Sequence, residues 1–116
     1  PMREFLYVDD MASASIHIMN LPHDEFLSAV PDRMCSHVNI GTGCDVTIEE
    51  LSRIMALVVG FDGIVSFDTS KPDGAPRKLL DVNRLNSLGW QYSVGLEQGL
   101  TSTYEWFLKS LDDLRA

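Results

Sequence analysis

The chain has 116 residues and a formal net charge of −8, with 45% hydrophobic and 22% charged residues. This composition is ordinary for a folded globular protein and excludes an intrinsically disordered chain. Affinity for nucleic acid depends largely on cations that neutralise phosphates, so the acidic balance argues against a DNA or RNA partner. No apolar run approaches the roughly 18 residues of a membrane span, and no signal peptide is visible. We therefore expect no membrane association and a cytoplasmic location.

The cysteines and histidines do not follow a metal-binding pattern. Cys35 and Cys44 lack CxxC spacing, and the three histidines, at positions 17, 23 and 37, have no ligand spacing with them or with one another. We therefore expect no metal site. Buried free thiols are favoured over a disulfide for the two cysteines, and the sequence leaves the disulfide open.

The first part of the chain predicts a strand followed by a helix. Residues Arg3–Val8 are aromatic and β-branched, which is typical of a strand. Asp9 and Asp10 suit the cap of a helix, because the helix dipole favours acidic groups there. The helix should end near Asn20, just ahead of a proline. The mixed pattern of positions 21–36 predicts no more than a helical turn, with three apolar anchors, Phe26, Leu27 and Val30.

The middle of the chain predicts two short strands with a helix between them. His37–Ile40 and Gly63–Phe67 are the two apolar runs. Thr47 and Glu50 have the spacing of a capping box, which should open the helix. Gly60 should end it.

Two further helices are predicted toward the C-terminus. Asp81 can cap a short helix that Gly89 ends, after which Trp90 should pack on the core. Ser93 should cap the last helix. The apolar residues of that helix recur at helical spacing: Leu96, Leu100, Tyr104, Phe107 and Leu111.

The alternation of about three short strands with four or so helices favours an α/β fold. Three short strands form a small sheet for so much helix, and a strand-like run begins almost at Pro1. We therefore expect the chain to be a piece of a longer protein, with the rest of the sheet upstream.

The glycine-rich turn Gly41-Thr42-Gly43 lies between a predicted strand and a predicted helix, as a phosphate-binding loop does. However, Val46 stands where the third glycine of G-x-G-x-x-G belongs, and no Walker lysine follows. A tight strand-to-helix turn is therefore the preferred interpretation. Asp45 would also repel a phosphate.

The loop at positions 71–78 is the denser candidate site. Lys71, Arg77 and Lys78 bring three cations to a segment that two prolines stiffen, and Asp73 adds an acceptor. The residues alone are equally consistent with a ligand-binding loop and with a solvated turn. Arg3 lies beside Glu4, and a surface salt bridge is the preferred interpretation for that pair. No spacing such as G-x-S-x-G arranges a nucleophile, so no catalytic residue is predicted.

Several segments, in order, resemble the C-terminal part of the extended short-chain dehydrogenase/reductase family of nucleotide-sugar enzymes. The matching segments are REFLYVDDMASASIHIM, HVNIGTG ahead of TIEEL, KPDGAPRKLLDVNRLNSLGW and LEQGLTSTYEWFL. Within that family, PMREFLYVDDMA together with FDTSKPDGAPRKLLD is similar to the GDP-L-fucose synthases. The resemblance implies an NADPH-dependent epimerase-reductase parent that converts GDP-4-keto-6-deoxymannose to GDP-L-fucose.

The resemblance also implies which residues contact the GDP-sugar. Carried onto matching positions, they are Arg3, Asp73 and Lys78, with Arg77 as a neighbour. We expect Arg3 and Lys78 to face the diphosphate or sugar and Asp73 to accept a hydrogen bond. The dinucleotide fingerprint and the Tyr-x-x-x-Lys pair of the family are absent from these 116 residues. No cofactor-binding residue is therefore expected here, and NADP(H) should bind a Rossmann domain upstream in the parent.

Residues 1–116 are thus expected to form a single substrate-binding segment that is inactive alone, from a parent that is a homodimer. Without the dinucleotide domain, the segment should expose an apolar face and self-associate. Two alternatives stay open. One is a stand-alone nucleotide-sugar binding or interaction module, and the other is a related NAD(P)-dependent epimerase or dehydratase with a different substrate.

Overall fold

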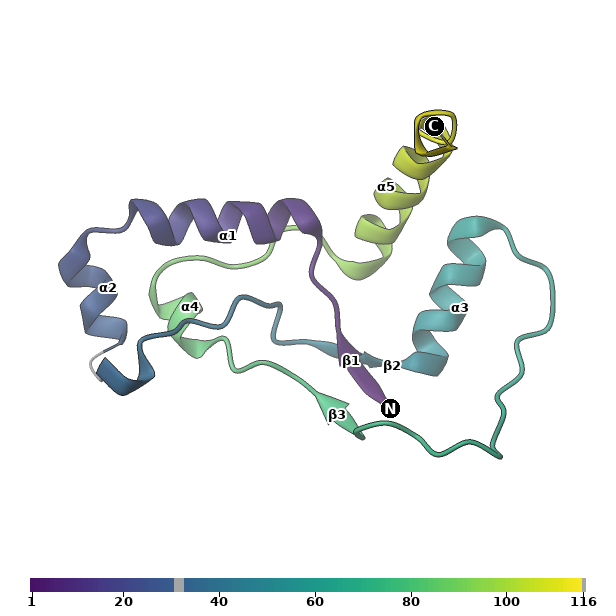
Figure 1. Cartoon of the computed structure of the whole chain (residues 1–116), viewed down its shortest axis with the longest axis horizontal. Helices are drawn as coiled ribbons and strands as arrows, with labels where there is room; N and C mark the ends of the chain where they lie inside the picture. The colour runs from purple at the N-terminus through teal and green to yellow at the C-terminus, as the bar shows by residue number, and fades with distance from the viewer. Residues whose placement is uncertain (31–32, 116) are drawn as a thin grey trace.

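The computed structural model describes residues 1–30 and 33–115 and shows an open α/β arrangement (Figure 1). In the described residues, a small sheet is accompanied by five α-helices and two 3-10 helices. The strands are β1 (Met2–Glu4), β2 (Asp45–Thr47) and β3 (Arg77–Lys78). The α-helices are α1 (Val8–Asn20), α2 (His23–Ala29), α3 (Ile48–Val59), α4 (Asn83–Ser87) and α5 (Leu96–Lys109). The 3-10 helices are Arg33–Cys35 and Asp113–Arg115. The predicted fold class is confirmed.

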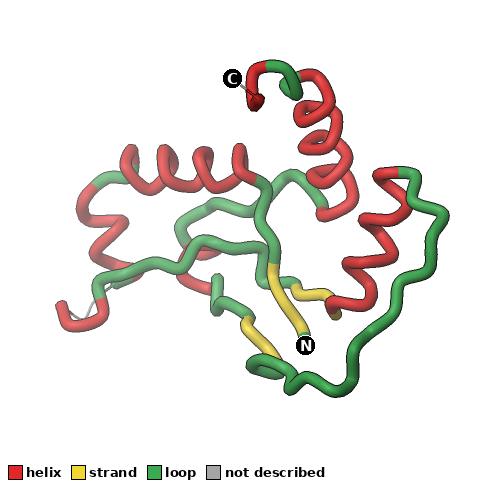
Figure 2. The backbone as a smooth tube through the Cα atoms, turned by 45° about the vertical axis from the view of Figure 1, so that its right-hand side comes forward, coloured by secondary structure: helices red, strands yellow, loops and turns green. Residues whose placement is uncertain are grey.

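The molecule is elongated rather than spherical. Its radius of gyration is 17.9 Å, whereas a compact domain of this length would have a value of about 13 Å. Helices α1, α2 and α4 gather at one end, α3 and α5 at the other, and the sheet lies between them (Figure 1). A long loop from α3 to β3 runs around the outside of α3 (Figure 2). No helix in the described ranges is both long and apolar enough to cross a membrane.

The sheet has the strand order β2-β1-β3, with β1 in the centre. Strand β1 is antiparallel to β2, which pairs Arg3 with Val46, and parallel to β3, which pairs Arg3 with Lys78. Strand β2 comes shortly after the glycine-rich turn, and strand β3 lies in the basic loop. The sheet therefore joins the two candidate loops of the sequence on either side of Arg3.

The buried core lies between α1 and α4. Ala14, Leu85 and Trp90 are buried together, with four partly buried neighbours, Leu6, Ile18, Val38 and Ile40. The indole Nε1 of Trp90 donates to Ser13 Oγ at 3.2 Å. Gly89 has φ +86°, a conformation that favours glycine and ends α4 ahead of Trp90. The predicted positions of Gly89 and Trp90 are confirmed.

The predicted ends of α3 are also confirmed. Thr47 Oγ1 accepts from the Glu50 amide at 3.0 Å, and Glu50 Oε2 accepts from the Thr47 amide at 2.9 Å. The Thr47 hydroxyl also donates to Glu50 Oε2 at 2.8 Å. The bonds from the Thr47 amide and hydroxyl hold the pKa of Glu50 below its ordinary value. Gly60 ends the helix with φ +70°. The end of α1 at Asn20 is also as predicted. Asp81 is not the cap of α4, because Val82 stands at the N-cap without a side-chain bond; the Asp81 carboxylate lies one residue earlier and accepts from the Asn83 amide at 2.9 Å.

Two of the predicted strands are wrong. His37–Ile40 has no strand partner. Instead Val38 and Ile40 pack on the core, and the Asn39 side-chain Nδ2 donates to Asp81 O at 3.1 Å. Gly63–Phe67 belongs to the outer loop, where Ile64 is 95% exposed. Both runs have strand-like composition, but a strand needs a neighbouring backbone to pair with, and neither run has one.

The predicted strand Arg3–Val8 is too long, because pairing stops at Glu4 and α1 already begins at Val8. Asp9 and Asp10 are therefore inside the first turn of α1, not at its cap. Ser93 does not cap the last helix, since α5 begins at Leu96 and Gly95 stands at its N-cap without a side-chain bond. The helical turn expected within 21–36 is confirmed as α2, and positions 31 and 32 lie outside the described residues.

Both cysteines are free thiols, as favoured. Cys35 is half-buried, but Cys44 is exposed, so the expected burial is wrong for Cys44. Cys44 follows the glycine-rich turn directly and leads into the edge strand β2, where one face meets solvent.

Candidate anion-binding site

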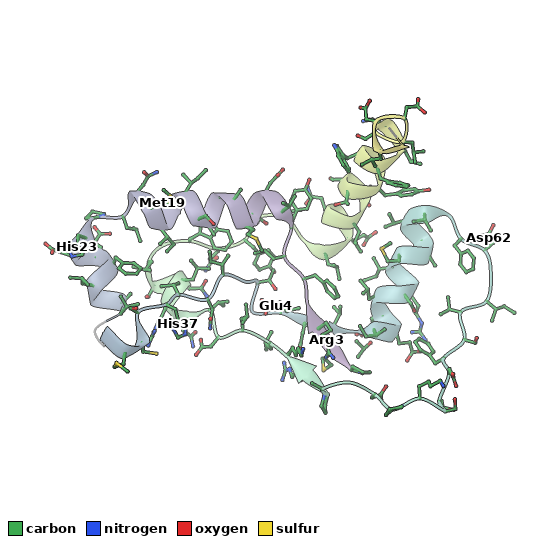
Figure 3. The ribbon with its side chains drawn as sticks, in the orientation of Figure 1. Arg3, Glu4, Met19, His23, His37 and Asp62 are labelled. Atoms are coloured by element: carbon green, nitrogen blue, oxygen red, sulfur yellow. The ribbon has the colours of Figure 1, made fainter. Side chains whose placement is uncertain are left out.

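Arg3 lies at the centre of the sheet, on the middle strand β1. Its Nη1 donates to Met2 O at 2.6 Å and to Ala75 O at 2.8 Å. Its Nη2 would lie 3.4 Å from a Cβ placed on Gly74, so the basic loop passes directly against the guanidinium. Arg3 therefore holds the 71–78 loop to the sheet through a backbone oxygen. Figure 3 shows Arg3 and Glu4 in the middle of the molecule, between its two ends.

Lys78 is the register partner of Arg3 across the parallel pair β1–β3. Both residues line a hollow of about 450 Å³, together with the carboxylate residue Glu4 and with Leu6, Ile40 and Leu80 among others. Neither cation has a carboxylate partner within residues 1–30 and 33–115, where ion pairs form only at Arg53–Glu49 and Arg77–Asp45. The salt bridge expected between Arg3 and Glu4 is therefore wrong. Two neighbouring, unneutralised cations favour an anion beside them.

Arg77 differs from Lys78 because it is neutralised. Its Nε donates to Asp45 Oδ2 at 2.5 Å and its Nη2 to Asp45 Oδ1 at 3.1 Å, a two-point contact between β3 and β2. The Asp45 side chain is only 5% exposed. The hydrogen bond and charge of Arg77 hold the pKa of Asp45 below its ordinary value, and Asp45 raises the pKa of Arg77. Asp45 thus binds the arginine of the basic loop, and the pair ties the outer strands together.

Asp73 lies in a different hollow from Lys78. That hollow measures about 540 Å³ and is lined by Asp73, Lys71, Phe67 and Thr47 among others. It shares no lining residue with the hollow of Arg3 and Lys78. The structure therefore brings Arg3 and Lys78 together in one hollow and places Asp73 with Lys71 in the other.

Glu4 is an important residue of this region that the sequence pattern did not reveal. Its Oε1 accepts from the amides of Thr42 and Gly43 at 2.5 and 2.8 Å, and its Oε2 accepts from the Leu80 amide at 2.9 Å. A Cβ on Gly41 would collide with Glu4 Oε1. The glycine-rich turn therefore wraps around a carboxylate of the chain itself, which supports the preferred turn interpretation over a phosphate loop.

Asp10 is a second residue with an unexpected role. It is buried, and its carboxylate accepts from the Ser93 hydroxyl at 2.7 Å and from the amides of Ser93 and Val94 at 3.1 and 2.8 Å. Burial raises the pKa of Asp10, but these hydrogen bonds together outweigh it, and the net pKa is lowered. Asp10 thereby fixes the segment that leads into α5.

The segment that Asp10 fixes forms part of a smaller hollow on Arg3. This hollow measures about 150 Å³ and is lined by Arg3, Phe5, Tyr92 and Val94 among others. Aromatic and apolar side chains next to a cation suit a ligand with a flat ring and an anionic group. The local sequence signal for Asp10 and Glu4 is weak, since their hydrogen-bond partners lie 38 to 84 positions away.

No protein-family model matches the chain. Among curated proteins, it is 59% identical over 115 residues to GDP-L-fucose synthase of Escherichia coli strain K12 and 46% identical over 111 residues to putative GDP-L-fucose synthase 2 of Arabidopsis thaliana. The chain is related to the GDP-L-fucose synthases. The two matches cover 99% and 96% of this chain but 36% and 31% of those synthases, so it spans about a third of their length.

Solved structures agree with this relation. A GDP-mannoheptose C4 reductase from Campylobacter jejuni with NADP bound matches with a TM-score of 0.77 and 34% identity, over 92% of this chain and 32% of that one. A GDP-6-OMe-4-keto-L-xylo-heptose reductase from C. jejuni matches with a TM-score of 0.81 and 35% identity, over 94% and 31%. The resemblance to GDP-L-fucose synthases and the α/β fold that it implied are confirmed.

Proposed function

We propose that this chain is the GDP-sugar-binding segment of a GDP-L-fucose synthase-like enzyme. In this proposal, residues 1–116 are one C-terminal substrate-binding segment, and an NADP-binding Rossmann domain precedes them in the parent. The parent is an NADPH-dependent epimerase-reductase that forms GDP-L-fucose from GDP-4-keto-6-deoxymannose. The identity of 59% to the E. coli synthase over nearly the whole chain supports this substrate more than any other.

The observation that carries the proposal is the pair of cations on neighbouring strands. Arg3 and Lys78 are in register and have no carboxylate partner in the described residues, whereas Arg77 is neutralised by Asp45. A diphosphate supplies the two negative charges that such a pair accommodates. Arginine offers a planar fork of donors and lysine a compact charge, so together they bind and orient the phosphates.

Asp73 and Lys71 form the second part of the proposed site. Asp73 carries an acceptor into the larger hollow, where it suits a hydroxyl of the sugar or a donor of the base. Arg3 contacts the same loop two residues after Asp73, at the Ala75 carbonyl oxygen. Arg77 then supports the loop through Asp45 and does not contact the ligand itself.

We expect no dinucleotide site in the described residues. Two amides of the glycine-rich turn already donate to Glu4, so they are not free for a pyrophosphate. The sequence also has no Tyr-x-x-x-Lys pair, since Met11 and Leu108 stand four residues after Tyr7 and Tyr104. We therefore place NADP(H) and hydride transfer in the rest of the parent, and expect the chain alone to be inactive.

A related GDP-sugar reductase is the second candidate, because the matching solved structures include GDP-heptose reductases at 34–35% identity. A stand-alone binding module is a third candidate. The native protein separates these possibilities. A reductase carries a dinucleotide-binding domain upstream of this segment, which a module does not need. A fucose synthase would turn over GDP-4-keto-6-deoxymannose in preference to a GDP-heptose.

Two variants test the proposed ligand contacts by calorimetric titration with GDP. Lys78→Ala removes one cation and should weaken binding by about one to two decades, since a charge-assisted contact contributes roughly 1.5–3 kcal/mol. Arg3→Lys keeps the charge but loses the fork, and should also weaken binding. Lys109→Ala, on the exposed end of α5, is the matched control. If Lys78→Ala and Arg3→Lys bind GDP like the unmodified chain, the residue assignment is wrong.

A further inference from the structure

The Glu4 carboxylate joins three segments that are far apart in the sequence. It belongs to β1, its Oε1 binds the turn at Thr42 and Gly43, and its Oε2 binds Leu80, beyond β3. Thr42 Oγ1 adds a fourth contact, to Oε1 at 3.2 Å. Both carboxylate oxygens are therefore used to hold the backbone.

The position of these contacts relates Glu4 to the cation pair. Glu4 directly follows Arg3, and Leu80 is two residues after Lys78. Strand β3 consists of Arg77 and Lys78 alone, so its ladder with β1 is very short. The bond from the Leu80 amide to Glu4 adds one more hydrogen bond between β1 and the segment that follows β3. It thereby limits how far Lys78 can move from Arg3.

We propose that Glu4 is a positioning residue that sets the separation of Arg3 and Lys78 and so the affinity for the diphosphate. This inference rests on the proposed function. Charge alone predicts the opposite effect, because a carboxylate next to two cations repels a bound anion. If only charge mattered, removing the negative charge of Glu4 would strengthen binding of the diphosphate. If Glu4 positions the cations, removing its charge weakens that binding.

Two substitutions separate position from charge. Glu4→Gln keeps the length and one acceptor oxygen but places an amide group where Leu80 needs an acceptor. Glu4→Asp keeps the charge but is one methylene shorter, so it cannot reach both the turn and Leu80. Glu105→Gln, on the exposed surface of α5, is the matched control for the loss of one negative charge.

The test is a GDP titration of the 116-residue chain, its two Glu4 variants and the control, with amide hydrogen exchange at Leu80 measured alongside. We expect both Glu4 variants to bind GDP about tenfold more weakly, which corresponds to about 1.4 kcal/mol. Exchange at Leu80 should accelerate while the amides of α3 stay protected. In a Lys78→Ala background, Glu4→Gln should have little further effect, because Glu4 acts through Lys78.

Unchanged or tighter GDP binding by Glu4→Gln overturns the positioning role. Equal losses with and without Lys78 show that Glu4 acts on the fold as a whole and not through the cation pair, which also overturns it. If the unmodified chain does not bind GDP, the proposed function fails for this chain, and faster exchange at Leu80 then reports a contact of the fold only. If Glu4→Gln does not fold, Glu4→Asp decides by the same criteria.

Discussion

Replacing the buried carboxylate of Asp10 should remove a large part of the stability of this chain. Asp10 accepts three hydrogen bonds from the segment that leads into α5, one from the Ser93 hydroxyl and two from the Ser93 and Val94 amides. In Asp10→Ala all three donors lose their partner. Asp10→Asn keeps one acceptor oxygen, so it should have a smaller effect.

The size of the effect follows from the exposure of the donors. A hydrogen bond to a charged group contributes about 1.5–3 kcal/mol, but water can replace part of it at exposed Ser93 and half-buried Val94. We therefore expect Asp10→Ala to lower the free energy of unfolding by about 2–3 kcal/mol, against a total of about 5–15 kcal/mol for an ordinary domain. With a urea slope near 1.5 kcal/mol/M, the midpoint should fall by about 1–2 M.

Urea unfolding followed by circular dichroism measures this change, with Asp9→Asn as the control in the same helical turn. The pH dependence gives an independent check. The folded-state pKa of Asp10 lies below its ordinary value of 3.8, so its contribution is present above that value and lost as the pH falls through the lowered pKa. The difference between the unmodified chain and Asp10→Asn should therefore shrink in acid. An Asp10→Ala variant with an unchanged urea midpoint would refute this reasoning.

Two further predictions concern the capping box and the exposed apolar residues. Thr47→Ala removes the acceptor for the Glu50 amide at the start of α3 and should cost about 1 kcal/mol in urea unfolding. Ser28→Ala should have little effect, because the Ser28 hydroxyl donates to Glu25 O and caps no helix N-terminus. The chain should also self-associate, because Ile64, Met19 and Leu57 are 95%, 83% and 80% exposed and such apolar surface favours association. Light scattering over a concentration series measures this, and a constant monomer mass would contradict it.

The features that the sequence predicted correctly are those with local signals. The capping box of Thr47 and Glu50 spans three residues, and Gly60 and Gly89 each end a helix through their own positive φ. Trp90 is buried because a large aromatic side chain next to a short helix has few other places to pack. Each of these features depends on residues that are close in the sequence, so the sequence predicts it directly.

The features that the sequence did not reveal depend on distant partners. Strand β3 exists because Lys78 meets Arg3, and no local property of Arg77 and Lys78 distinguishes them from a turn. Conversely, Gly63–Phe67 has the composition of a strand but no backbone beside it. Glu4 and Asp10 were not recognised as structural anchors because their partners, Leu80 and Val94, lie 76 and 84 positions away. The family resemblance assigned Arg3 and Lys78 to one ligand site, whereas no sequence pattern did.

The most direct test of the central claim is a calorimetric titration of the chain with GDP, ADP and UDP at low and high salt. If Arg3 and Lys78 bind the diphosphate of a GDP-sugar, GDP should bind, its affinity should fall as salt screens the two cations, and ADP and UDP should bind more weakly. Equal affinity for all three nucleotides would contradict the GDP-sugar assignment. An affinity for GDP that does not change with salt would contradict the role of the cation pair.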